Sequence, residues 1–159
     1  MINIQIHARN ISGLGATILV NDLLETLKFQ DKNLNFKLIL PTEYQFPRSK
    51  LLAQNIQIEY TGYFIKPISR FWELFRKYDV EAEELIVLGD IPLNYSGRSI
   101  VFLQNPHVIP TLTKINGLNI WMNRYFFRRN INKNTIIVVQ TDLIKRELLL
   151  NYKGNLEAQ

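Results

Sequence analysis

The sequence predicts an α/β fold: a doubly wound, mostly parallel sheet of about six strands with helices on both faces. The first observation is that segments with strand periodicity alternate along the chain with segments of helical periodicity, an order typical of α/β proteins. The second is that several strand segments are apolar throughout, which is typical of parallel strands buried on both faces.

The amino-terminal half contains three strand segments and two helical segments. Isoleucine alternates with polar residues at the very start of the chain, as side chains do on one face of a strand. Pro41 ends the second strand segment, because proline cannot donate to a ladder. The strand segments are Met1–His7, Asn35–Leu40 and Ile56–Tyr60. The helical segments are Ala16–Phe29 and Ile68–Tyr78, and we expect Phe71, Trp72 and Phe75 on the inner stripe of the latter.

The carboxyl-terminal half repeats the alternation with shorter and more apolar strands. Its strand segments are Leu85–Leu88, Ile100–Leu103 and Thr135–Gln140. Its helical segments are Leu118–Asn130 and Asp142–Asn151. Asp142 stands near the start of the last helix and Gly154 follows its end, the positions where acidic residues and glycine are enriched.

Length and composition indicate one globular domain over residues 1–159, with 47% hydrophobic and 21% charged residues. The chain has no cysteine, which excludes disulfides, thiolate chemistry and cysteine metal sites. Its two histidines, His7 and His107, are too far apart for zinc-ligand spacing. No apolar run approaches the length of a membrane span, and the strand pattern begins at once, without a signal peptide. We therefore expect a cytoplasmic protein.

The positive charge is concentrated in one part of the sequence. The formal net charge is +5, from 19 lysines and arginines against 14 acids. No acid occurs between Ile91 and Thr141. The cations of this stretch are Arg98, Lys114, Arg124, Arg128, Arg129 and Lys133. One surface of the protein should therefore be distinctly basic.

The first candidate site lies where the apolar strand of Ser99–Pro110 stops. Ligands of open α/β sheets bind beyond the carboxyl ends of the strands. Here that edge offers the amides of Gln104 and Asn105 and the imidazole of His107, which can orient a sugar hydroxyl or accept a proton. Asp90, which follows the preceding strand, occupies the equivalent edge. A plain loop packed by its prolines is the alternative interpretation.

The second candidate is the glycine turn after the first strand. Gly13 and Gly15 stand where backbone N–H groups and a helix dipole can bind phosphate. A dinucleotide fingerprint is incomplete, because Ile18 replaces its third glycine and no acid closes the second strand. The turn can equally be a plain connection, and His7 at the end of the first strand is more simply structural. No nucleophile–base pair or metal motif is visible.

The third candidate is a basic patch of Arg124, Arg128 and Arg129 on the helix of residues 118–130. Trp121, Tyr125 and Phe126 interleave with these arginines, a composition suited to an anionic membrane surface or a lipid-linked acceptor. The alternative, which the pattern favours, is an ordinary helix with its aromatic residues inward and its arginines solvated.

The order of the motifs carries a family resemblance. The glycine turn is followed by LGDIPLN, VFLQNPH and IIVVQTDLIKREL, and this order resembles the amino-terminal half of a GT-B glycosyltransferase. The chain is most similar to the large retaining family that builds bacterial surface polysaccharides and lipid-linked glycans. In that family a central strand ends in a loop bearing histidine or asparagine, as Gln104–His107 does. Residues 136–148, with Thr141 among them, match the strand before the inter-domain connection.

The resemblance implies a Rossmann-like domain that forms half of a GT-B fold and mainly binds the acceptor. Gly13 and Gly15 would line the cleft near the diphosphate of a nucleotide-sugar, and Asn105 and His107 would lie beside the transferred sugar, with His107 catalytic. Most of the donor site would belong to a carboxyl-terminal domain beyond Gln159. We therefore expect an amino-terminal domain of a longer enzyme, inactive alone, without metal or other cofactor, and peripheral at the inner face of the membrane.

Two other functions remain open. A non-catalytic nucleotide- or sugar-binding module would use the same crevice without transferring a sugar. A nucleic-acid-binding domain would explain the basic stretch, but no RNA-binding motif accompanies it and we expect no nucleic-acid partner. Codons beyond Gln159 that encode a second α/β domain with two glutamates would favour the transferase.

Overall fold

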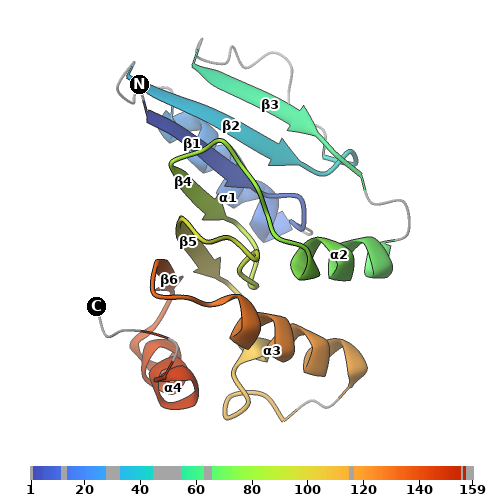
Figure 1. Cartoon of the computed structure of the whole chain (residues 1–159), viewed down its shortest axis with the longest axis vertical. Coiled ribbons are helices and arrows are strands. Elements are labelled where there is room, and N and C mark those ends of the chain that lie inside the picture. Colours follow the sequence, from blue (N-terminus) through green and yellow to red (C-terminus); the bar gives the residue numbers. More distant parts are fainter. Residues whose placement is uncertain are drawn as a thin grey trace.

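The structure is a computed structural model, and it describes residues 2–11, 14–27, 33–44, 55–62, 66–114, 117–154 and 156, with only the backbone of 14–16 and 66–67. Six parallel strands form one open sheet in the order β3-β2-β1-β4-β5-β6 (Figure 1). The strands are β1 (Ile2–His7), β2 (Leu34–Leu40), β3 (Ile56–Tyr60), β4 (Glu84–Val87), β5 (Arg98–Leu103) and β6 (Thr135–Val139). The predicted doubly wound, Rossmann-like α/β fold is confirmed.

Helices cover both faces of the sheet. They are α1 (Leu14–Leu27), α2 (Lys66–Phe75), α3 (Leu118–Asn130) and α4 (Asp142–Tyr152), and a short 3-10 helix, η1 (Pro106–Val108), follows β5. The helix α1 packs on one face and α2, α3 and α4 pack on the other, over β4, β5 and β6 (Figure 1). The element boundaries agree with the sequence expectation within two or three residues, the normal scatter at helix and strand ends.

The α1 face of the sheet is built from the apolar residues that alternate along β1, β2 and β3. Ile6, Leu38 and Ile56 point to this face and pack with Val20 and Leu24 of α1. Because the side-chain period of a strand is two, their neighbours in sequence point to the opposite face. Apart from Ile39, those neighbours are polar, so α1 covers the more apolar face of this half of the sheet.

The second apolar cluster lies on the opposite face. Leu85 and Val87 of β4 and Val101 and Leu103 of β5 are almost fully buried there. They pack against one residue or more from each of three helices: Leu74 of α2, Phe126 and Phe127 of α3, and Leu148 and Tyr152 of α4. Phe127 and Tyr152 meet edge to face, with ring centroids 5.0 Å apart. The two clusters divide the core between the two faces of the sheet.

The helix α2 turns a different side to the core from the one expected. Trp72 is 66% exposed and Phe75 52% exposed, whereas Glu73 and Leu74 between them are buried. Phe71 is partly buried and stacks on Phe126 of α3. The expectation of an inner stripe of Phe71, Trp72 and Phe75 was therefore wrong for two of its three members, because the buried carboxylate of Glu73 faces the sheet instead.

The helix α3 also exposes part of its aromatic content. Trp121 is 60% and Tyr125 46% exposed, while Phe126 and Phe127 are buried. The inward placement that the sequence pattern favoured therefore holds for Phe126 and not for Trp121 or Tyr125. Among the described residues, no helix is both long enough and apolar enough to cross a bilayer.

A buried amide at the end of α3 ties three elements together. The Nδ2 atom of Asn130 donates to the carbonyl of Leu74 at 3.0 Å and to that of Pro92 at 2.9 Å. These bonds join α3 to α2 and to the loop after β4, and Asn130 is only 3% exposed. A buried carbonyl without a partner is destabilising, so the side-chain amide of Asn130 contributes to the stability of the fold.

We predict that Asn130→Ala lowers the free energy of unfolding by about 2 kcal/mol, because the carbonyl of Pro92 loses its side-chain donor and that of Leu74 keeps only the longer bond from Arg129, at 3.3 Å. Urea unfolding followed by circular dichroism measures the change. Asn119→Ala is the matched control, since Asn119 lies exposed in the same helix and alanine has the higher helix propensity. Equal effects of the two substitutions would contradict the role assigned to Asn130.

Candidate functional site

The candidate site lies at the carboxyl edge of the sheet, where β1 and β4 are neighbours. Their connections run to opposite faces, which makes this pair the topological switch point at which open α/β sheets bind ligands. The loops that follow the two strands touch, because a Cβ atom on Gly89 would lie 3.7 Å from that of Asn10. The backbone N–H of Leu88 donates to the carbonyl of His7 at 2.9 Å and extends the pairing to this point.

Asp90 shapes the neighbouring loop. Its Oδ1 atom accepts hydrogen bonds from the backbone N–H groups of Gln104 and Asn105, both at 2.8 Å. Burial raises the pKa of the carboxyl, and these two bonds, together with the charges of Arg70 and His107, act in the opposite direction. Asp90 thus holds the end of β5 beside β4 and brings three predicted site residues, Asp90, Gln104 and Asn105, into contact.

His107 is held by contacts of its backbone. The side chain of Asn105 accepts a bond from the N–H of His107 at 3.1 Å and so caps η1. Arg124 of α3 donates from Nε to the carbonyl of His107 at 3.1 Å and from a terminal nitrogen to that of Thr113 at 2.7 Å. The loop is therefore fixed from two sides, and its position does not depend on the imidazole ring.

The imidazole itself has an unused hydrogen-bonding atom. The Nδ1 atom of His107 is buried and has no hydrogen-bond partner in the part of the chain that the structure describes. The Nε atom of Arg70, on α2, is also buried and also has no hydrogen-bond partner among the described residues. The charges of both residues oppose the rise in the pKa of Asp90. Buried polar atoms nearly always have partners, so two such nitrogens at one edge suit a ligand with acceptor groups.

Sequence reasoning did not find Arg70. The sequence feature that could have identified Arg70 is its spacing from Glu73. Arg70 stands one helical turn before Glu73 and therefore shares the face of α2 that is directed at the sheet. The face could not be assigned from the periodicity alone, since the apolar residues of α2 suggested the opposite orientation.

His7 belongs to a buried polar network next to this cluster. Its Nε2 atom lies 3.1 Å from Oε1 of Glu73, and Arg9 donates to the same oxygen at 3.1 Å. Arg9 also donates to the carbonyl of Gly62. His7 and Glu73 are almost fully buried, so the network supports the simpler interpretation that His7 is structural.

Tyr78 borders the same network. Its ring meets the edge of His7 with centroids 5.7 Å apart, and its hydroxyl accepts from Nε2 of Gln5 at 2.8 Å. Burial and the charge of Glu73 raise the pKa of Tyr78 to about 12, because both disfavour the phenolate. Tyr78 therefore stays neutral and acts as a packing and hydrogen-bonding residue.

Two of the remaining predicted ligand-binding residues, Gly15 and Thr141, are found at helix starts. Gly13 lies outside the described residues, and Gly15 is the second residue of α1. Thr141 is the N-cap of α4, and its hydroxyl accepts from the N–H of Ile144 at 3.3 Å. Thr141 stands at the same edge of the sheet but follows β6, so two strands separate it from the switch point.

The three arginines of the predicted basic patch go to three different places. Arg124 is bonded to the loop after β5, as described above. Arg128 is exposed, with its guanidinium 6.0 Å from the ring centroid of Tyr152. Arg129 donates to the carbonyls of Leu74 at 3.3 Å and Phe75 at 3.1 Å, at the carboxyl end of α2, where a cation is favoured by the helix dipole.

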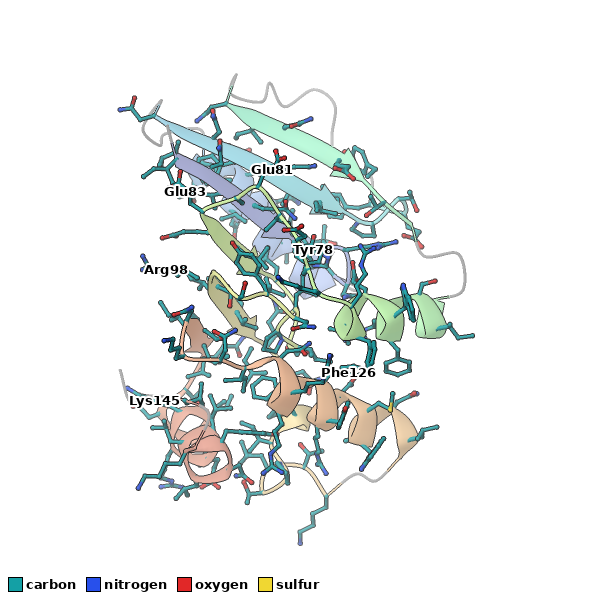
Figure 2. The ribbon with its side chains drawn as sticks, in the orientation of Figure 1. Tyr78, Glu81, Glu83, Arg98, Phe126 and Lys145 are labelled. Carbon is teal, nitrogen blue, oxygen red and sulfur yellow. The ribbon has the colours of Figure 1, made fainter. Side chains whose placement is uncertain are left out.

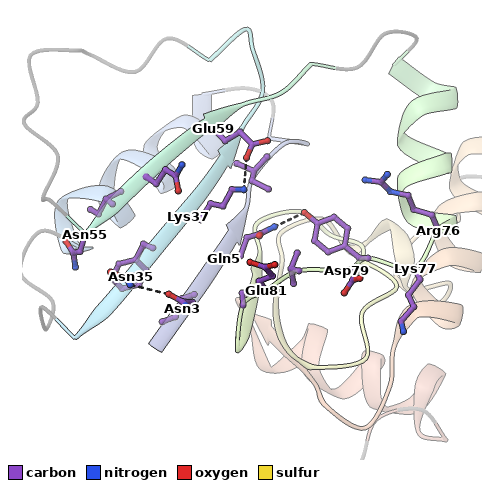
Figure 3. A pocket seen from close by; sticks show the side chains of 18 residues that line it. Asn3, Gln5, Asn35, Lys37, Asn55, Glu59, Arg76, Lys77, Asp79 and Glu81 are labelled. Atoms are coloured by element: carbon purple, nitrogen blue, oxygen red, sulfur yellow. Dashed lines mark hydrogen bonds and ion pairs between the residues drawn. The ribbon is translucent and has the colours of Figure 1, made fainter. Parts of the chain in front are cut away.

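A separate groove of about 890 Å³ lies between residues 76–82 and the face of β1, β2 and β3 opposite α1 (Figure 3). Four of its polar side chains form pairs: Asn35 with Asn3 at 3.2 Å, and Lys37 with Glu59 at 2.8 Å. None of the predicted site residues lines this groove. We place the candidate site at the carboxyl edge instead, because the unpaired nitrogens of Arg70 and His107 lie there.

Comparisons with protein-family models, with curated proteins and with solved structures find no match to this chain.

We predict that Asp90→Ala lowers the free energy of unfolding by about 2 kcal/mol, because it leaves the N–H groups of Gln104 and Asn105 without an acceptor. Asp90→Asn should be at least as stable as the wild type at neutral pH, since the amide oxygen can accept both bonds without burying a charge. Urea unfolding of the three proteins measures both effects.

The same variants test the pH dependence. The folded-state pKa of Asp90 is raised, so its contribution to stability is complete below the ordinary aspartate pKa and is lost as pH rises through the raised value. The stability of the wild type relative to Asp90→Asn should therefore fall with rising pH in the acid range. A relative stability that increases with pH there would contradict this prediction.

Proposed function

We propose that this chain forms one wall of a glycosyltransferase cleft, where it binds the acceptor beside the sugar transferred from a nucleotide-sugar. The observation that carries the proposal is the buried Nδ1 atom of His107, just beyond the carboxyl end of β5, which has no hydrogen-bond partner among the described residues. The order of the motifs that end in this loop supports the same function, because it resembles that of retaining GT-B enzymes.

The geometry suits a polyhydroxylated ligand with an anionic group. The Nδ1 atom of His107 can exchange a hydrogen bond with a sugar hydroxyl. The guanidinium of Arg70, whose Nε atom is buried and lacks a partner among the described residues, can bind a phosphate or carboxylate oxygen. Asp90 keeps the loop of His107 in place and does not itself need to touch the ligand.

The other contributions in this proposal come from the first turn of α1 and from a second domain. The amino-terminal end of α1, which contains Gly15, carries the positive end of the helix dipole and can face the donor diphosphate. Most of the donor site belongs to a carboxyl-terminal domain in this proposal, and no residue of this chain is assigned to a metal.

We predict that His107→Ala, made in the natural gene product that contains this chain, lowers sugar transfer by about ten- to a hundredfold. His107→Asn should retain part of the activity, because the asparagine Oδ1 atom can occupy the place of Nδ1. Transfer of radiolabelled sugar from nucleotide-sugars to membrane extracts measures the rates.

The stability of both variants should match the wild type, because the contacts that hold residue 107 are made by its backbone. Unchanged transfer in a stably folded His107→Ala protein would remove His107 from the site. Binding of nucleotide-sugar or glycan without transfer by the natural gene product would instead support a non-catalytic binding module.

A further inference from the structure

The helix α2 exposes a large part of its apolar surface. Its side towards the core presents Leu74 together with the carboxylate of Glu73, and its solvent side presents Ile68, Trp72 and Phe75. All three are more than half exposed, at 65%, 66% and 52%. A surface helix normally turns its apolar stripe to the core. These three side chains of α2 therefore face outward, and Phe75 is contacted there by the guanidinium of Arg129.

The helix α3 presents a similar stripe beside it. Leu118, Trp121 and Tyr125 are spaced by three and four residues and lie on the exposed side of α3, with Leu118 76% exposed. The two helices pack side by side, joined by the stacked rings of Phe71 and Phe126 (Figures 1 and 2).

The two stripes form one continuous surface. Arg129, one turn after Tyr125, lies with its guanidinium 4.6 Å from the ring centroid of Phe75 and so bridges the helices. Trp72 stacks on Phe75 and Trp121 stacks on Tyr125, with centroids 6.5 Å and 5.8 Å apart. We call the resulting surface the aromatic face; it consists of Ile68, Trp72, Phe75, Leu118, Trp121 and Tyr125.

The charged residues that α2 and α3 expose are all basic, and the first exposed acid after α2 is Asp79. The only acid of α2 is the buried Glu73, and α3 contains none. Arg128, Arg129, Arg76 and Lys77 are exposed on these helices or directly after α2. A groove of about 250 Å³ between α3 and α4 adds Arg124 and Arg128 to the border of Trp121 and Tyr125. The partner of the aromatic face should therefore be both apolar and anionic.

We propose that the aromatic face docks on the surface of an anionic lipid bilayer. Indole and phenol rings favour the membrane interface, because one side of each is apolar and the other polar. Each nearby arginine or lysine adds attraction to anionic headgroups, and this attraction is screened by salt. The inference stands on the exposure and charge of α2 and α3 and does not depend on the proposed glycosyl transfer.

A second copy of the chain fits this surface less well. A symmetric dimer through the aromatic face would bring the same arginines of two chains together, with no exposed acid on either helix to compensate. The repulsion of like charges opposes that arrangement, whereas an anionic bilayer satisfies the arginines and the aromatic rings at once.

The two tryptophans make the proposal directly measurable. Trp72 and Trp121 are the only tryptophans of the chain, and both lie in the aromatic face. Vesicles of phosphatidylcholine mixed with phosphatidylglycerol should shift the emission to shorter wavelength, and lipids with brominated chains should quench it. Trp72→Phe and Trp121→Phe each leave one reporter, and both remaining signals should respond, because the two helices dock together.

Matched charge substitutions test the location of the surface. Ile68→Glu combined with Leu118→Glu should lower the vesicle-bound fraction in co-sedimentation by at least about tenfold, since it removes two apolar side chains and adds two negative charges. Leu143→Glu combined with Leu150→Glu is the control, because these residues of α4 are also more than half exposed but lie outside the aromatic face. The control should bind vesicles like the wild type, and circular dichroism should show both variants folded.

Three results would overturn the proposal. An emission spectrum unaffected by anionic vesicles would exclude docking, and equal binding to vesicles of phosphatidylcholine alone would exclude the anionic requirement. A blue shift that grows with protein concentration without lipid, together with dimers in sedimentation velocity, would assign the surface to a second copy. Two results together would support the proposal: vesicle binding that weakens as salt is added, and a loss of binding in the aromatic-face variant but not in the α4 control.

Discussion

The buried carboxylate of Glu73 is the constraint on which the arrangement of α2 depends. A buried charge is tolerated only when it is paired, and here His7, the last residue of β1, and Arg9, in the loop after it, supply the partners. Because Glu73 must face the end of β1, Arg70 one turn earlier also faces the carboxyl edge of the sheet. The opposite side of α2, with Trp72, is turned to solvent for the same reason. One ion-pair network thus determines both the edge cluster and the exposed side of the helix.

The fold could be predicted from the sequence because its signals are local. The alternation of apolar and polar residues along β1, and the apolar runs at β4 and β5, depend on neighbours two or three residues away. The orientation of α2 could not be predicted in this way. Its apolar residues define a stripe, but the choice between core and solvent was decided by His7 and Arg9, more than sixty residues distant in sequence.

Part of the candidate site could also be predicted from the sequence, for a related reason. Strand ends can be located from composition, so Asp90, Gln104, Asn105 and His107 could be assigned to one edge, and the structure places them in one cluster. Which atoms are already used within that cluster depends on tertiary contacts. Asp90 uses its carboxylate to hold the loop, and Arg124 of the expected basic patch binds the same loop. Arg70 could be assigned to the candidate site only from the structure, which shows the side of α2 that faces the sheet.

The polar groove over β1, β2 and β3 also bears on how these strands find their partners. Asn3 pairs with Asn35 and Lys37 with Gln57 on the polar face, while Ile6 pairs with Leu38 and Phe36 with Ile56 under α1. A slip of one residue in either pairing would turn a whole strand over and bring Lys37 or Glu59 into the apolar layer. The open face therefore discriminates against misregistered sheets during folding, since each wrong alignment buries a charge that the native alignment leaves in water.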